Sequence, residues 1–155
     1  MSFFLKPVLL SFTLIIASTS IVLTSESKTM MIVKSPSEFD YTTTRERLIK
    51  SVYGNGLVLF GEFDHAQAAQ NVGLSMPPTT VLVFGNPKGG TSLMLANPDL
   101  ALDLPFRVLI SQQSDGRVMV SYHSAEALQG FGLSSGSIEA LIKLEQLVEN
   151  SIARP

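Results

Sequence analysis

The hydrophobic and polar positions along the chain follow two different periods, which predict strands in some segments and helices in others. Short apolar runs bounded by Gly, Pro, Asn or Ser predict strands, and apolar residues spaced three and four apart predict helices. Residues 79–84 (TTVLVF) are apolar on both faces, which predicts a central strand. The predicted strands are residues 30–34, 57–63, 79–84, 105–112 and 117–122, and the predicted helices are residues 41–53, 65–72, 91–96, 125–129 and 137–152.

Capping and turn residues separate these elements. Asp40 or Thr43 can cap the first helix, and Asp64 can cap the second. Residues 85–90 (GNPKGG) predict a Gly-rich loop before the third helix, and residues 114–116 (SDG) predict a hairpin. The order β-α-β-α-β-α-β-β-α-α predicts an α+β domain with a mainly antiparallel sheet covered by helices, some of them short.

Several short motifs occur in an order and spacing typical of one known family. They are Phe63-Asp64-His65, Gly73-Leu74, Pro78-Thr79, Phe84-Gly85-Asn86-Pro87, Gly90-Thr91 followed by Met94, Asp103-Leu104-Pro105, and Asp115-Gly116 before Tyr122. Through them, residues 30 to 152 resemble the domain of unknown function 302 family. The resemblance implies a β-α-β(4)-α core related to the TATA-box-binding-protein-like fold, and a tendency to dimerise. It implies no activity, and kinship of fold conveys no DNA binding, because function belongs to sites.

The N-terminal segment differs from the rest of the chain in its lack of charge. Lys6 is the only charged residue before Glu26. A short positive region followed by an apolar stretch predicts a signal peptide within residues 1–24, although the stretch also suits an uncleaved membrane anchor. We therefore expect a single domain, residues 30–153, that is exported to the periplasm or secreted, with contact to the membrane only through the N-terminal segment.

Composition excludes several classes of function. The chain of 155 residues has no cysteine, which excludes disulfides, thiol nucleophiles and cysteine-ligated metals. The formal net charge of -2 provides no basic surface, so we expect no nucleic-acid partner. Ser134, Ser135 and Ser137 surround Gly136 and precede a helix, so capping is a sufficient explanation for them. No dinucleotide-binding fingerprint is present.

Candidate catalytic residues are His65 and its neighbour Asp64. An imidazole held by a carboxylate could act as a general base. With His123 and either Asp64 or Asp103 it could also ligate a metal, but the spacings match no known metal motif, so no metal site and no cofactor are assigned. The structural alternative is that Asp64 caps a helix and His65 is solvated.

Candidate ligand-binding residues centre on residues 85–91. This segment lies between a buried strand and a helix start, where backbone N–H groups can converge on an anion. It is no P-loop, because Thr91 stands where a P-loop needs Lys. A structural role in turns, caps or packing is the alternative for each candidate. The predicted ligand-binding residues are Thr79, Gly85, Asn86, Gly90, Thr91, Met94, Asp103 and Tyr122.

Three functions are compatible with these patterns. The first is an exported, homodimeric domain that binds a small or anionic ligand, or serves as an accessory domain, with an apolar pocket formed by residues 63–65, 78–79 and 85–91. The second is an enzyme in which His65 is the base and the 85–91 loop stabilises a developing negative charge. The third is an envelope interaction protein that has no pocket.

Overall fold

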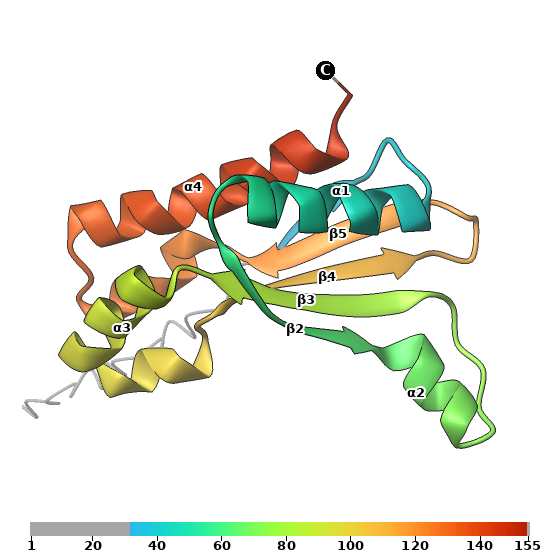
Figure 1. Cartoon of the computed structure of the whole chain (residues 1–155), viewed down its shortest axis with the longest axis horizontal. Coiled ribbons are helices and arrows are strands. Elements are labelled where there is room, and N and C mark those ends of the chain that lie inside the picture. Colours follow the sequence, from blue (N-terminus) through green and yellow to red (C-terminus); the bar gives the residue numbers. More distant parts are fainter. Residues whose placement is uncertain (1–31, 155) are drawn as a thin grey trace, which may run out of the picture.

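The computed structural model describes residues 32–154, in which five strands form one antiparallel sheet (Figure 1). The spatial order is β1-β5-β4-β3-β2, and every neighbouring pair is antiparallel. The predicted α+β class with a mainly antiparallel sheet is therefore confirmed. The strands are β1 (Ile32–Pro36), β2 (Val58–Asp64), β3 (Thr79–Gly85), β4 (Phe106–Gln112) and β5 (Val118–His123).

Four α-helices and two 3₁₀ helices connect and cover the strands. Without α2, α3 and the 3₁₀ helices, the chain order is β-α-β-β-β-β-α, the core arrangement that the family resemblance implies. No helix within residues 32–154 is long and apolar enough to cross a membrane, and the predicted export signal lies outside these residues. The helices are α1 (Tyr41–Gly54), α2 (His65–Asn71), α3 (Pro87–Ala96), η1 (Pro98–Leu102), η2 (Ala125–Phe131) and α4 (Ser135–Ile152).

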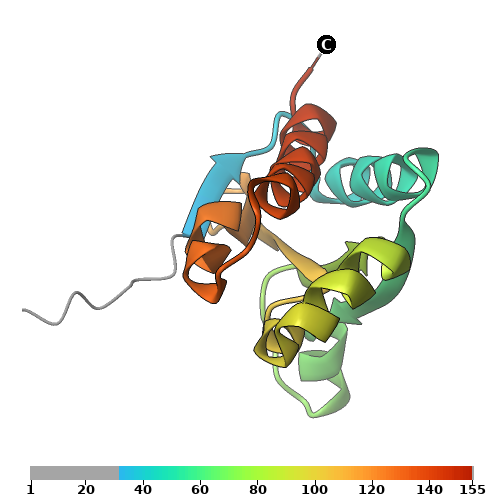
Figure 2. The same ribbon diagram turned by 90° about the vertical axis from the view of Figure 1, so that its left-hand side faces the viewer.

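The main core lies between the sheet and the antiparallel helices α1 and α4 (Figures 1 and 2). Successive side chains of a strand point to opposite faces, so Leu82 and Phe84 of β3 are buried under the helices while Val81 and Val83 are half-buried on the other face. A second, smaller core forms at one end of the sheet around η1, η2 and the first half of α4. Leu144 of α4 packs against both cores.

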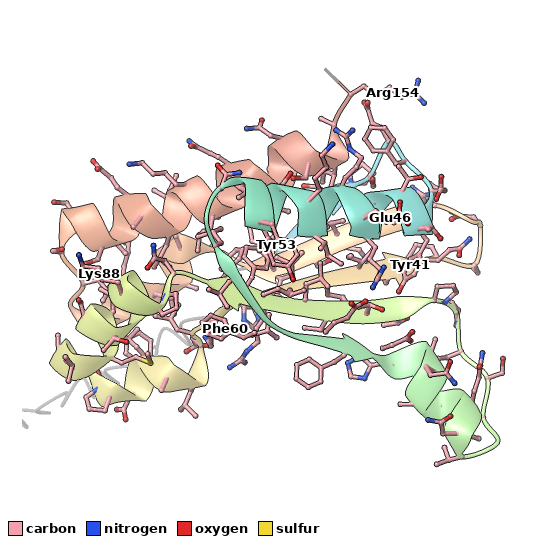
Figure 3. All side chains as sticks on the ribbon, in the orientation of Figure 1. Tyr41, Glu46, Tyr53, Phe60, Lys88 and Arg154 are labelled. Carbon is pink, nitrogen blue, oxygen red and sulfur yellow. The ribbon has the colours of Figure 1, made fainter. Side chains whose placement is uncertain are left out.

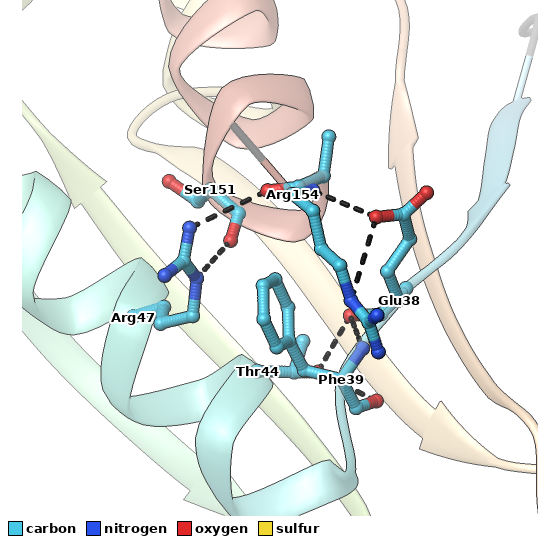
Figure 4. A network of polar contacts seen from close by, with 8 residues as sticks. Glu38, Phe39, Thr44, Arg47, Ser151 and Arg154 are labelled. Carbon is cyan, nitrogen blue, oxygen red and sulfur yellow. Dashed lines mark hydrogen bonds and ion pairs between the residues drawn. The ribbon is translucent and has the colours of Figure 1, made fainter.

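A polar network joins the beginning of α1 to the end of α4 (Figure 4). The Arg47 guanidinium lies over the Phe39 ring, 4.2 Å from its centroid, and its Nε donates to the carbonyl of Ser151 at 2.8 Å. The backbone N–H of Arg154 donates to the Glu38 carboxylate at 2.7 Å. Because the last carbonyls of a helix lack partners within the helix, the Arg47 bond satisfies one of them, and both contacts hold the end of α4 against α1 and the residues before it.

Local capping signals account for most helix starts. Asp40, and not Thr43, caps α1, and its carboxylate accepts from the Thr43 N–H at 2.9 Å, which lowers the pKa of Asp40. Asp64 caps α2 in the same way through the Gln67 N–H. Ser134 caps α4, which begins at Ser135, two residues earlier than predicted.

The predicted Gly-rich loop is wrong, because α3 begins at Pro87 and includes most of that segment. Asn86 is the cap, and Pro at the first helical position is already fixed near a helical φ. Gly89 and Gly90 have no positive φ, so both adopt a helical backbone. The poor helix propensity of glycine suggested a loop, but the cap and Pro87 determine the start.

Candidate functional site

A cavity of about 1000 Å³ lies where α1 ends and α4 faces α3 across the end of the sheet. In Figure 1, α4 extends well past the end of α1, and α3 lies opposite the part of α4 that α1 leaves uncovered. Residues from α1, β2, β3, α3, β4 and α4 line the cavity. It is much larger than a second cavity, of about 20 Å³, beside Asp103 and His123.

The walls are mainly apolar because the cavity lies at the junction of the two cores. Phe106 and Leu57 contribute from the main core, Leu93 and Met94 from the second, and Leu144 from the helix that both cores share. Phe60 adds an aromatic wall on β2, at the point where the register with β3 shifts (Figure 3). A bulge of this kind inserts an extra residue into the strand and changes the direction of a side chain.

Five predicted ligand-binding residues line this cavity together: Gly85, Asn86, Gly90, Thr91 and Met94. They do so as the end of β3 and the first two turns of α3, not as a loop. Their ligand-binding role remains a prediction.

The backbone N–H groups at the start of α3 are engaged within the helix and its cap. The Asn86 side chain accepts from Lys88 at 3.0 Å and from Gly89 at 3.2 Å, and the Gly90 N–H donates to the Asn86 carbonyl at 2.8 Å. Pro87 has no N–H. The predicted convergence of donors on an anion or oxyanion is therefore absent from this turn, because the cap satisfies the donors that such a site would use.

The structure also separates His65 from this segment. Asp64 pairs with Thr80 near the start of β3, whereas Val58 pairs with Gly85 at its end. At about 3.3 Å per residue, the five steps from Thr80 to Gly85 span roughly 16 Å. The proposed pairing of a His65 base with the 85–91 segment, which needs hydrogen-bond reach or one bridging water, is therefore wrong within one chain.

The remaining candidates are dispersed. Thr79 lies at the His65 end of β3 and donates to the Pro77 carbonyl at 2.9 Å. Residues 63–65 and 78–79, expected to line the same pocket as 85–91, are thus at the opposite end of the strand. Asp103 ends η1 and lies near His123, far along the sheet from His65. Within residues 32–154 no three His, Asp or Glu side chains are placed to hold a metal ion.

Tyr122 is buried under α4 and does not line the cavity, and its hydroxyl donates to the Glu149 carboxylate at 2.9 Å. Burial and this carboxylate raise the pKa of Tyr122. The Ser35 hydroxyl of β1 donates to the same Glu149 oxygen at 3.0 Å. The cluster joins α4 to the two strands beneath it, so Tyr122 has a structural role.

No pattern in the sequence indicated the α4 side of the cavity. The residues of α4 that line it recur at helical spacing, and they include Ser137, Ala140, Leu144 and Leu147. Their mixture of small and apolar types resembles an ordinary core-facing stripe, which is why no signal distinguished them. Only the gap left beyond the end of α1 turns this stripe into a cavity wall.

Comparison with known proteins identifies the family of the chain. The model of the family described as "Domain of unknown function DUF302" matches residues 32–151. A crystal structure of an uncharacterized conserved DUF302 protein from Bacillus stearothermophilus has the same fold, with a TM-score of 0.65 and 19% sequence identity. The similarity covers 79% of this chain and 96% of that one.

Two curated relatives are longer than this chain, and the similarity covers only part of each. The "Fluoride-specific ion channel FluC 1" of Brucella suis biovar 1 (strain 1330) is 33% identical over 115 residues, which cover 72% of this chain and 45% of that protein. The protein of the same name from Brucella abortus biovar 1 (strain 9-941) is also 33% identical over 115 residues, with 43% of its length covered. The chain therefore spans less than half the length of these relatives.

Proposed function

The chain belongs to the DUF302 family of domains of unknown function, and we propose that it binds a small, largely apolar molecule in the cavity between α3 and α4. The size and the mainly apolar lining of the cavity support this proposal. Its volume of about 1000 Å³ lies at the upper end of the ~300–1,000 Å³ found for small-molecule sites, which are mostly apolar with a few polar groups.

The α3 wall suits a ligand of variable shape. No residue of α3 is fully buried, although Leu93 and Met94 pack partly against the second core. Elements with few buried contacts open at low free-energy cost, and the unbranched Met94 side chain adapts to different shapes. We propose that α3 moves slightly to admit the ligand while the sheet and α4 stay fixed.

Filling the cavity tests this proposal. Ala140 lies on the α4 wall, so Ala140→Phe places a ring in the ligand volume. Leu95→Phe is the matched control, because Leu95 is 80% exposed and lies outside the lining. We expect an apolar fluorescent dye and short alkyl compounds to raise the Tm of the wild type and of Leu95→Phe, and to affect Ala140→Phe much less. Equal ligand effects on all three proteins would refute a role for the cavity.

We also propose that the domain acts outside the cytoplasm, as an exported binding or accessory domain. The uncharged N-terminal stretch after Lys6 supports export. The Brucella relatives support an accessory role, since a region similar to this chain makes up 45% of a protein named for ion transport. Cell fractionation and mass spectrometry of the mature N-terminus test the location: loss of about 20 residues indicates cleavage, and a cytoplasmic full-length chain would refute export.

A homodimer is a further proposal, and the face of the sheet opposite α1 and α4 supports it. The register places Phe63, Val81 and Leu109 side by side on this face, and Phe63 is 56% exposed. The charged residues of this face, Lys34 and Arg107, lie on β1 and β4, so the β2–β3 half is uncharged. A two-fold axis near that half would stack apolar side chains and keep like charges apart.

The homodimer is tested by light scattering of Phe63→Lys. Tyr53→Lys is the control, because Tyr53 is 60% exposed on α1, on the covered side of the sheet. We expect a dimeric wild type and control, and a monomeric Phe63→Lys with unchanged circular dichroism. A monomeric wild type at high concentration, or a dimeric Phe63→Lys, would show that this face does not mediate assembly.

A further inference from the structure

We infer that the ligand of the α3–α4 cavity is a monoanionic amphiphile, an alkyl chain with one negatively charged head group, and that Lys143 recognises the head group. This inference rests on the proposed binding function and specifies its ligand. Three features support this ligand: the length of the cavity, the single charge in its lining and the positions of the neighbouring carboxylates.

The cavity is elongated along α4. Its lining on this helix extends from Ser137 through Ala140, Leu144 and Leu147 to Asn150. At 1.5 Å per residue, these 13 steps correspond to roughly 20 Å, which suits an extended alkyl chain better than a compact ring system. The facing residues Leu93, Met94 and Phe106 continue the apolar surface.

Lys143 is the one ionisable residue among those that line the cavity. It is exposed, and within residues 32–154 its ammonium group makes no ion pair. A lysine at the rim can keep its ammonium group in water while its apolar stem covers the wall. This arrangement leaves the charge available to a ligand head group at the mouth of the cavity.

The carboxylates of α4 are directed away from the cavity or lie outside its lining. Glu149 accepts from Tyr122 and Ser35 on the sheet side of the helix. Glu145 accepts from the backbone N–H of Ala125, at the start of η2. Glu139 does not line the cavity. With no carboxylate in the lining, the local field at the mouth favours an anion over a cation.

The experiment compares three probes that share one alkyl chain and differ in head-group charge: dodecanoate, 1-dodecanol and dodecyltrimethylammonium. Affinities for the full chain are measured by dye displacement below the micelle-forming concentrations, together with Lys143→Met and the matched control Lys50→Met. Lys50 is an exposed lysine of α1 outside the lining. Methionine keeps an unbranched stem and removes only the charge.

We expect dodecanoate to bind more tightly than dodecanol, and dodecyltrimethylammonium to bind most weakly. Lys143→Met should weaken dodecanoate about three- to tenfold, as expected for a charge-assisted contact at a partly exposed site, and leave dodecanol unchanged. Lys50→Met should change neither affinity. Equal binding of all three probes that is insensitive to Lys143→Met would overturn the head-group assignment and leave the cavity proposal intact. Failure of all three probes to bind would overturn both.

Discussion

The sharpest test of the local structure is a pair of substitutions in α3, Gly89→Ala and Gly90→Ala. In a Gly-rich loop these glycines would supply backbone freedom, and alanine would be neutral or harmful. In the structure both are helical and neither has a positive φ. A Cβ at Gly89 would have its nearest neighbour, the Asn86 Cβ, at 4.0 Å, and one at Gly90 would meet the Met94 Cε at 3.9 Å. These are ordinary van der Waals contacts, so the added methyl groups fit.

The expected magnitude follows from helix propensity. Replacing glycine by alanine inside a helix stabilises it by about 0.5–1 kcal/mol per site, so the double variant should gain about 1–2 kcal/mol. For a domain of this size, that free energy corresponds to an increase in Tm of roughly 3–8 °C. Because no residue of α3 is fully buried, part of the gain should appear as slower local opening, with amide protection in α3 increased about tenfold.

Thermal unfolding and hydrogen exchange of the double variant measure both effects. Gly116→Ala is the control, because Gly116 of the β4–β5 hairpin has φ +84°. An L-residue there costs about 1–2 kcal/mol, so this variant should lower the Tm. If the Gly89→Ala/Gly90→Ala variant lowers the Tm as Gly116→Ala does, or leaves α3 exchange unchanged, the assignment of residues 87–90 to a helix is refuted.

Three further predictions concern the polar contacts and the core. The raised pKa of Tyr122 means that the unfolded chain loses this proton first, near pH ~10, so the stability due to Tyr122 is complete below that pH and declines above it. Tyr122→Phe should lower the free energy of unfolding at pH 7 by about 1–3 kcal/mol, through loss of the bond to Glu149. It should also flatten the decline of stability in alkali, and an unchanged alkaline slope would contradict this. Asp40→Ala should lower the Tm at pH 7 but much less in acid, because the lowered pKa of Asp40 makes its cap fully effective above the unfolded value of ~3.9 and the effect is lost as the pH falls through the lowered pKa. Asp40→Asn, which keeps a capping oxygen, should restore most of the loss. Leu82→Ala in the centre of β3 should lower the free energy of unfolding, measured by urea denaturation, by about 2–5 kcal/mol. A decrease below ~1 kcal/mol would argue against burial of Leu82 between the sheet and α1.

The elements that the sequence predicted well are those with a local physical signal. The apolar run of β3, the hairpin at residues 114–116 and the cap at Asp64 each depend on neighbours within a few residues. Periodicity and capping report backbone geometry directly. The order of the strands and α-helices along the chain was predicted correctly for the same reason, whereas the structure adds the 3₁₀ helix η1 before β4 and forms a 3₁₀ helix, η2, after β5.

The candidate site was predicted only where it is continuous in sequence. The five predicted residues from Gly85 to Met94 that line the cavity do so because they follow one another along β3 and α3. His65 was grouped with them because both segments lie at strand ends, but β3 runs the length of the sheet between them. Single-sequence patterns do not state which end of an antiparallel sheet a residue occupies until the register is known.

The sequence by itself determined the class of fold, the absence of cysteine chemistry and the positions of most caps, because these depend on composition and on short-range hydrogen bonds. Only the tertiary structure decided that the first half of α4 extends beyond the end of α1, which leaves a cavity at the junction of the two cores. It also paired Tyr122 with Glu149 and directed Lys143 to the cavity. These pairings join residues far apart in the chain, and their free energy is realised only when packing brings the elements together.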